Sequence, residues 1–194
     1  MKLYDIISNL KILGIKNYHE LEIDSLTCDS KEKLSNGIYF CIKGMKTDGH
    51  DYAEESIKNG AVCLVVEKYL DLPNTQILVE NVRRAMSYIS SIFYETYKSK
   101  MKFVGITGTN GKTTTTFLIR EILLKMGKKV GLIGTEGIYI NSLMLPPMLT
   151  TPDPINLHKT IKRRFDTLLP QLYHRCRRFS RKGAGDCCFQ KYVV

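Results

Sequence analysis

The sequence predicts an α/β fold with two parts, a small N-terminal α/β domain and the beginning of a second domain built on a parallel sheet. Short strand patterns alternate with helical patterns over most of the chain, which is typical of sheets covered by helices. The 194 residues are 43% hydrophobic and 25% charged, so they can bury a core. A glycine-rich turn at 108–111 separates a strand pattern from a helical one, which favours a β-α-β unit.

The first hundred residues carry the alternation from the N-terminus onward. Five apolar residues between Leu3 and Leu13 recur at helical spacing, which predicts a helix over 3–13 that ends at Gly14. Runs of β-branched and aromatic residues predict strands, and amphipathic stretches between them predict helices. The expected elements are strands at 38–42, 61–66 and 76–79 and helices at 51–60 and 81–99, the last with Val82, Met86, Ile89, Phe93 and Tyr97 on one face.

A domain boundary is expected near residue 100, because a new β-α-β pattern follows it. Strands are expected at 103–107 and 129–135, and a helix at 112–126 that buries Phe117, Leu118, Ile122 and Met126. Prolines at 146, 147, 152 and 154 exclude regular structure before a helix near 154–162. Residues 163–194 show neither period and receive no element. The expected domains are 1–100, an incomplete one over 101–162, and a basic tail over 163–194 that is out of frame or disordered.

The net charge of +10 is concentrated in this tail. Residues 163–194 contain eight of the 29 Lys and Arg residues and two of the 19 acidic residues, which leaves +4 for residues 1–162. Basic residues before the tail are mostly Lys, whereas the tail contains six Arg. The body of the chain therefore lacks the basic character typical of nucleic-acid binding.

Several classes of protein are excluded by composition. No apolar run reaches the roughly 18 residues of a membrane span, and residues 1–5 lack the features of a signal peptide. The six cysteines show no CxxC or Cys/His ligand spacing, so we expect Cys28, Cys41 and Cys63 in the core rather than in zinc sites or disulfides. The four histidines stand singly, as surface or hydrogen-bonded residues do. We expect a cytoplasmic monomer without membrane contact.

The turn at 108–111 contains the residue types that a binding site for a nucleotide phosphate needs. Gly108 and Gly111 allow positive φ, so that backbone N–H groups can point into one concavity at a helix N-terminus. Lys112 would reach the β- and γ-phosphates, and the Thr113 hydroxyl would bind Mg²⁺. The spacing is shorter than that of the usual G-x-x-x-x-G-K-[ST] loop, because Ile106 stands where the first glycine would be. The alternative is a glycine-rich turn with a structural role only, which binds no ligand.

Three segments together resemble the Mur ligase family. Gly108-Thr-Asn-Gly-Lys-Thr-Thr114 is similar to its short ATP loop, whereas the related folylpolyglutamate synthases more often carry GTNGKGS. Leu26-Thr-Cys-Asp-Ser-Lys31, with 37–44 and 47–51, resembles the uridine-nucleotide domain of the members that add the third amino acid of peptidoglycan. Leu149-Thr-Thr-Pro-Asp-Pro154 resembles their substrate loop. The three segments follow one another in the same order as in the family, and the resemblance covers residues 1–162.

The resemblance implies site residues and a reaction. Gly108, Thr109, Asn110, Gly111, Lys112, Thr113 and Thr114 would bind ATP, and Thr113 would hold Mg²⁺. Ser30 would contact the UDP-sugar substrate, UDP-MurNAc-L-Ala-D-Glu, and Thr150 and Thr151 its peptide or phosphate part. In that reaction ATP phosphorylates the D-Glu carboxylate, and the amine of a diamino acid attacks the acyl phosphate. Taken alone, Asp29-Ser30 could be a turn or an N-cap, and Thr150-Thr151 a helix entry.

Two alternatives stay open at this point. The chain could be a folylpolyglutamate-synthase-type ligase, or a non-catalytic module that binds a nucleotide or RNA, since the Arg clusters of the tail interleave with Tyr173 and Phe179. The family's later catalytic segments and its C-terminal domain have no counterpart after residue 162, and no catalytic residue is assigned. We therefore expect a truncated, inactive fragment. The sequence leaves open whether the third amino acid is diaminopimelate or lysine.

Overall fold

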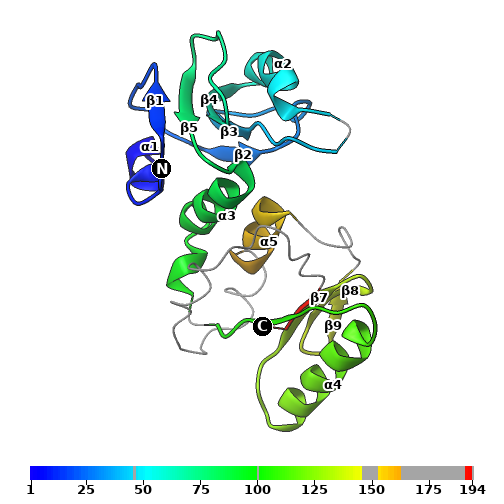
Figure 1. Ribbon diagram of the computed structural model, residues 1–194. Helices are drawn as coiled ribbons and strands as arrows, with labels where there is room; N and C mark the ends of the chain where they lie inside the picture. Colours follow the sequence, from blue (N-terminus) through cyan, green and yellow to red (C-terminus); the bar gives the residue numbers. More distant parts are fainter. Residues whose placement is uncertain (46, 100, 146–152, 163–190, 194) are drawn as a thin grey trace. The chain divides into compact units, whose positions relative to one another are not determined.

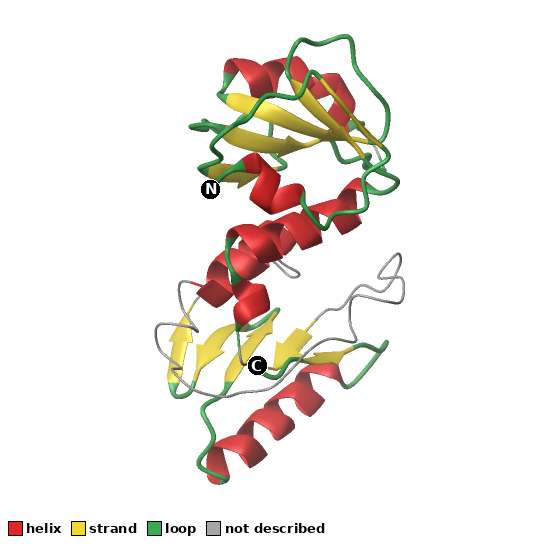
Figure 2. Ribbon diagram, turned by 90° about the vertical axis from the view of Figure 1, so that its left-hand side faces the viewer, coloured by secondary structure: helices red, strands yellow, loops and turns green. Residues whose placement is uncertain are grey.

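The computed structural model describes residues 1–45, 47–99, 101–145, 153–162 and 191–193. The chain divides into two compact units, Met1–Tyr94 and Glu95–Val194 (Figure 1). This division falls six residues before the boundary expected from the sequence. Each unit contains one five-stranded sheet with helices against it, so the expected α/β class is confirmed (Figure 2). The first sheet is mainly parallel, whereas the described strand pairs of the second are antiparallel, because β10 (Lys191–Val193) lies between β6 (Val104–Ile106) and β7 (Gly131–Gly134).

The sheet of the first unit is mainly parallel. Its strands are β1 (Gly14–Lys16), β2 (Ser25–Thr27), β3 (Gly37–Phe40), β4 (Ala61–Val66) and β5 (Thr75–Leu78), in the order β1-β5-β4-β3-β2. Strands β2 to β5 run parallel, and β1 pairs antiparallel with β5. The carboxyl ends of four strands therefore lie along one edge, where ligands of open α/β sheets bind.

Helices cover both faces of this sheet. Helix α2 (Ala53–Lys58), which follows the 3₁₀ turn η1 (Gly49–Tyr52), lies on one face, and α1 (Leu3–Ile7) and α3 (Val82–Phe93) lie on the other (Figure 2). The side facing α2 contains a core cluster in which Leu64 and Val66 of β4 are fully buried. On the α3 side, Val82, Met86 and Ile89 are buried as predicted. Both faces of the sheet are thus withdrawn from water.

The second unit has a sheet in the order β6-β10-β7-β8-β9. Its strands are β6 (Val104–Ile106), β7 (Gly131–Gly134), β8 (Gly137–Ile140), β9 (Leu143–Leu145) and β10 (Lys191–Val193). Strand β10 pairs antiparallel with both β6 and β7, so β6 and β7 run in the same direction, as a β-α-β unit requires. Helix α4 (Lys112–Lys125) connects them, and α5 (Pro154–Thr160) follows the hairpin β8–β9.

Alternation along β8 assigns its two faces to different helices. Ile138 and Ile140 join a core cluster against which Leu157 of α5 packs. Tyr139 points to the other face, where its ring makes an edge contact with Phe117 of α4 at 5.0 Å between centroids. Because successive strand side chains alternate, this single strand anchors α4 on one side and α5 on the other.

The first helix is shorter than predicted. It ends at Ile7 rather than at residue 13, and Leu13 is 59% exposed. The Leu13 amide instead donates to the Leu78 carbonyl at 2.8 Å, where the chain enters β1. Pairing with the edge of the sheet therefore overrides the helical spacing of Leu10 and Leu13.

The prediction for α3 was also too long. The helix ends at Phe93, and Glu95 adopts a left-handed conformation with φ +55°. Tyr97 lies beyond this break in the short 3₁₀ turn η2 (Thr96–Lys98) and is 58% exposed. Its place on the predicted apolar face is therefore wrong.

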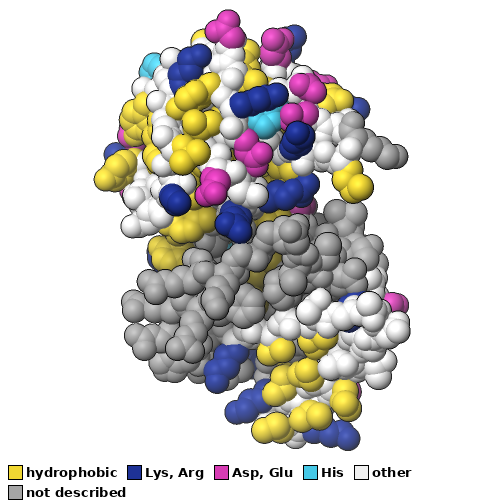
Figure 3. Space-filling view, in the orientation of Figure 1, with side chains coloured by type: hydrophobic (Ala, Val, Ile, Leu, Met, Phe, Trp, Pro, Cys, Tyr) yellow, Lys and Arg dark blue, Asp and Glu magenta, His cyan; other side chains and the backbone are white. Residues whose placement is uncertain are grey.

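The predicted buried face of α4 is wrong for three of its four residues. Leu118, Ile122 and Met126 are 59%, 49% and 63% exposed, and a group of hydrophobic side chains lies on the surface over α4 (Figure 3). Phe117 is half-buried against Tyr139. The sheet takes up the face that carries Thr116 and Arg120 instead, and the Arg120 guanidinium donates to the Asn141 carbonyl.

Two further expectations have mixed outcomes. Cys41 and Cys63 are buried as predicted, whereas Cys28 is exposed in the loop after β2. Burial raises the pKa of the Cys41 thiol to about 12, as an apolar core position does. The tail received no element from its sequence, yet Lys191–Val193 forms β10. Its other residues lie outside the described part of the chain.

Candidate functional site

The glycine-rich turn connects β6 to α4 as predicted. Residues 107–111 are exposed, Gly108 has φ +151°, and Gly111 has φ +75° and caps the 14-residue helix α4. A methyl group added to Gly111 would meet no atom within 4 Å. Among the described residues, the turn therefore leaves open space at the start of α4, at the end of the helix whose backbone N–H groups favour an anion.

Lys112 occupies the inside of this turn. Its ammonium group donates to the carbonyl of Gly108 and to that of Thr109, the latter at 3.1 Å. Both acceptors are neutral carbonyls, and the Lys112 ammonium group would form a stronger hydrogen bond with an anionic phosphate. The turn and Lys112 thus fit a phosphate group, with Thr109 and Asn110 exposed beside it.

The threonines after Lys112 have different environments. Thr116 is buried, and its hydroxyl donates to the carbonyls of Lys112 and Thr113, at 3.0 and 2.8 Å. Thr113 is half-buried at the helix start, and Thr114 is exposed. Within the described ranges no cluster of three or more His, Cys, Asp or Glu could hold a metal ion. A metal at this site would have to share its ligands with a bound phosphate, as the expected role of Thr113 implies.

Ser30 lies in the loop after β2, at the carboxyl edge of the first sheet. It is buried, and its hydroxyl donates to Glu55 of α2 at 2.5 Å. The Ser30 carbonyl accepts a hydrogen bond from the Asn59 side chain at 2.8 Å. The structure thus shows two partners of Ser30 that its sequence position alone did not suggest.

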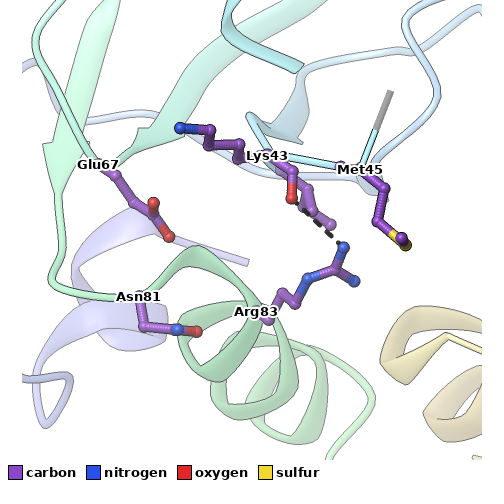
Figure 4. Close-up of a pocket in the computed structure, with 7 residues that line it drawn as sticks. Lys43, Met45, Glu67, Asn81 and Arg83 are labelled. Atoms are coloured by element: carbon purple, nitrogen blue, oxygen red, sulfur yellow. Dashed lines mark hydrogen bonds between the residues drawn. The ribbon is translucent and has the colours of Figure 1, made fainter. Parts of the chain in front are cut away.

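A cavity of about 390 Å³ lies at the same edge of the sheet (Figure 4). Ile42, Lys43, Gly44 and Met45 follow β3, Glu67 follows β4, and Asn81 and Arg83 begin α3. Arg83 donates to the Lys43 carbonyl at 3.5 Å and closes one side of the cavity. Ile42, Lys43 and Gly44 belong to the segment 37–44 that resembles the uridine-nucleotide domain, whereas Glu67, Asn81 and Arg83 were not predicted as site residues. Glu67 directly follows the predicted strand 61–66, the position at which a parallel sheet places ligand contacts.

His50 has a structural role beside this cavity. It is buried, its Nδ1 lies 2.6 Å from Asp48 Oδ1, and its Nε2 accepts the Glu67 amide at 3.1 Å. The Glu67 bond places the proton on Nδ1, so the imidazole donates to Asp48. Hydrogen bonds from the His50 amide and ring lower the pKa of Asp48 to about 2. Both ring nitrogens are occupied, so His50 is a hydrogen-bonded residue, as expected from its isolated position.

The two other predicted substrate contacts, Thr150 and Thr151, lie outside the described residues. The Asp153 that follows them caps α5 by accepting the Asn156 amide at 3.0 Å. None of the helices described is long and apolar enough to cross a membrane.

Fold and turn together define an α/β protein with a strand–turn–helix of P-loop type. Residues 22–94 match the Mur ligase family catalytic domain, and residues 106–167 match the Mur ligase middle domain. The chain belongs to the Mur ligase family. The resemblance drawn from the three sequence segments is thereby confirmed.

Two curated relatives are diaminopimelate-adding ligases by name. The UDP-N-acetylmuramoyl-L-alanyl-D-glutamate--2,6-diaminopimelate ligase of Bacillus velezensis is 40% identical over 167 residues, 86% of this chain and 34% of the relative. Ligase 1 of that name from Clostridium acetobutylicum is 42% identical over 163 residues, 82% of this chain and 33% of the relative. This chain therefore spans about a third of the length of these relatives.

A solved structure supports the fold. The structure of a UDP-N-acetylmuramoyl-L-alanyl-D-glutamate--2,6-diaminopimelate ligase superposes with a TM-score of 0.64 at 24% identity. It covers 75% of this chain, which corresponds to 30% of that chain. The arrangement of strands and helices is thus that of a Mur ligase over most of the residues compared.

Proposed function

We propose that this chain provides the UDP-sugar-binding and ATP-binding parts of an ATP-dependent ligase. The ligase would add diaminopimelate to UDP-MurNAc-L-Ala-D-Glu in peptidoglycan synthesis, the reaction named for its relatives. The observation that carries the proposal is the exposed turn 107–111, with Lys112 inside it, in a chain of this family. We propose diaminopimelate rather than lysine as the third amino acid because the relatives named above carry diaminopimelate in their names.

The roles of the residues follow from their placement. The N–H groups of residues 108–114 would bind the phosphates of ATP at the start of α4, and Lys112 would exchange its two carbonyl partners for phosphate oxygens. Thr113 would hold Mg²⁺ together with the phosphates; a bound Mg²⁺ neutralises charge that develops during phosphoryl transfer. The chain's own contribution would be to position ATP and to stabilise negative charge.

Ser30 would contact the UDP-sugar at the carboxyl edge of the first sheet, and Thr150 and Thr151 would contact its peptide or phosphate part. The cavity between Lys43 and Arg83 lies at the same edge as Ser30 and offers two cationic side chains. In the reaction, the D-Glu carboxylate would accept the γ-phosphoryl group of ATP, and the amine of diaminopimelate would displace phosphate to form the amide.

Binding measurements on the purified chain test the proposal. We expect ATP with Mg²⁺ to bind, and Lys112→Ala to weaken that binding by about 10- to 100-fold, because a charged hydrogen bond contributes about 1.5–3 kcal/mol. Lys125→Ala, at the other end of α4, is the matched control and should bind ATP as the unchanged chain does. Equal loss in both variants, or no binding of ATP at all, would refute the ATP site.

Substrate class is tested with the same protein. UDP-MurNAc-L-Ala-D-Glu should bind in preference to a folate, which would separate the cell-wall ligase from a folylpolyglutamate-synthase-type ligase. The chain spans a third of its relatives, so we propose binding for this chain and ligation for a whole ligase. We expect no ADP release when the chain is given UDP-MurNAc-L-Ala-D-Glu, ATP and diaminopimelate. Clear turnover would show that this chain is active on its own.

A further inference from the structure

The Ser30 hydroxyl is held by one side chain of the neighbouring helix. Glu55 lies in the first turn of α2, is half-buried, and accepts the Ser30 hydroxyl proton at 2.5 Å. Ser30 itself is 8% exposed, so little water competes for its oxygen. The carboxylate is acceptor-only when ionised, so in this pair the hydroxyl is the donor.

The backbone around Ser30 is fixed as well. Asn59, which follows α2, donates to the Ser30 carbonyl at 2.8 Å. The Asp29 amide donates to the Thr27 hydroxyl, and the Lys31 amide donates to Asp29 Oδ1, both at 3.0 Å. Helix α2 and the Asn59 that caps its C-terminus therefore hold both the side chain and the carbonyl of Ser30, so the hydroxyl has a fixed direction.

We infer that Glu55 is a positioning residue that makes Ser30 a hydrogen-bond acceptor for the nucleoside part of the UDP-sugar. The inference rests on the proposed function. A serine hydroxyl has one proton, and that proton is directed to Glu55, so the lone pairs of Ser30 Oγ are left for an N–H or O–H of the ligand. Uracil N3–H and the ribose hydroxyls are such donors.

Charge excludes the other end of the nucleotide from this position. Glu55 contacts Ser30, so a carboxylate lies beside the hydroxyl, and a second acidic residue, Asp29, is its neighbour in sequence. A diphosphate placed there would meet like charges and find no hydrogen-bond donor on Ser30. The neutral uridine faces Ser30, and the diphosphate lies elsewhere.

The experiment compares uridine nucleotides on the whole chain by calorimetry. Glu55→Ala frees the Ser30 proton, and we expect it to weaken UDP binding about tenfold, as Ser30→Ala does. The double variant should bind no more weakly than either single variant, because both remove one shared interaction. Glu54→Gln, an exposed neighbour in the same turn of α2, is the control and should not change binding.

Ligands that lack one donor distinguish positioning from a merely structural effect. We compare UDP with the diphosphates of 3-methyluridine, 2′-deoxyuridine and 3′-deoxyuridine, each of which lacks one hydrogen-bond donor. The analogue that lacks the donor facing Ser30 should bind about tenfold more weakly than UDP to the unchanged chain. That penalty should disappear in Ser30→Ala and in Glu55→Ala, and return in Glu55→Gln, whose amide oxygen still accepts the hydroxyl proton. Circular dichroism confirms that each variant is folded.

The outcomes separate the inference from the proposed function. If UDP binds to the unchanged chain and Glu55→Ala binds it equally well, or keeps the penalty for the missing donor, Glu55 does not position Ser30 and the inference is overturned. The UDP-sugar site would then still stand. If neither UDP nor UDP-MurNAc-L-Ala-D-Glu binds to the unchanged chain, the proposed function fails, and the inference fails with it.

Discussion

Helices α3 and α4 are of similar length but differ in how much of their surface the protein covers. Helix α3, of 12 residues, buries Val82, Ala85, Met86, Ile89 and Ser90. Of the 14 residues of α4, Thr116 alone is buried in the part of the chain that the structure describes. Helix α4 nevertheless carries apolar residues on both sides, the pattern of a helix that is covered on both sides.

The difference extends to the loops that hold the two proposed nucleotide contacts. Ser30 is buried and hydrogen-bonded at both its side chain and its carbonyl. The turn 107–111 is exposed, and its carbonyls at Gly108 and Thr109 accept from the Lys112 ammonium group. The proposed contact of the first unit is thus held in place on a packed core, whereas that of the second lies in an open turn, on a helix with one exposed face.

The largest predicted effect is a difference in stability between variants of α3 and of α4. Ile89 is fully buried and Ile122 is 49% exposed. We expect Ile89→Ala to lower the free energy of unfolding by about 4 kcal/mol, through lost burial and a cavity, and Ile122→Ala by less than about 1 kcal/mol. Urea unfolding gives the totals, and amide hydrogen exchange in α3 and α4 assigns them to a unit. Equal costs would show that the outward face of α4 is covered.

Two glycines provide the next comparison. Gly60 has φ +103°, and an added Cβ would lie 2.2 Å from the Leu34 carbonyl oxygen. Gly60→Ala should cost about 3 kcal/mol of stability, since it combines left-handed strain with a backbone clash. Gly111→Ala meets free space and should cost about 1–2 kcal/mol, from the left-handed backbone alone.

Thermal unfolding measures both glycine variants, and ATP titration gives a second readout. Gly111→Ala should weaken ATP binding because its methyl group occupies the opening of the turn, whereas Gly60→Ala should leave ATP affinity unchanged. A Gly111→Ala variant that binds ATP normally would place the phosphates away from this turn.

Between pH 7.5 and 5, a pH effect on stability should be confined to the second unit. His158 of α5 contacts the Thr96 hydroxyl at 2.6 Å, and burial lowers its pKa to about 4 from the ordinary 6.5. Its neutral form is favoured in the folded state, so the unfolded chain binds more protons between these values. Stability is full above pH 6.5 and falls as the pH decreases toward 4.

Between pH 7.5 and 5 the loss should be about 2 kcal/mol. Comparing urea unfolding of the unchanged chain with His158→Gln at both pH values isolates this contribution. His19→Gln, at an exposed position of the first unit, is the control. If His158→Gln keeps the full pH dependence, another group causes it.

Local sequence signals were sufficient where one interaction dominates. The β-branched run at 61–66 forms β4 with the predicted bounds, and the expected helix after Gly111 begins at Lys112. They were insufficient where partners are distant in sequence. Leu13 pairs with Leu78, and Ser30 pairs with Glu55, 25 residues later, and neither contact has a local pattern. Thr116 and Leu118 differ in burial because the sheet takes one face of α4, which helical spacing cannot specify.

The smallest effect concerns how the two helices begin. Asn81 caps α3 by accepting the Arg84 amide at 2.9 Å, whereas Gly111 caps α4 without a side chain. Asn81→Ala should therefore lower stability by about 1 kcal/mol, the usual contribution of a side-chain N-cap. Asn81→Ser retains an acceptor and should recover most of the loss. No side chain caps the start of α4, and we expect the phosphates of ATP to bind there, so saturating ATP should protect the α4 amides from exchange more than it protects those of α3. Equal protection of both helices would mean that the start of α4 is not where the phosphates bind.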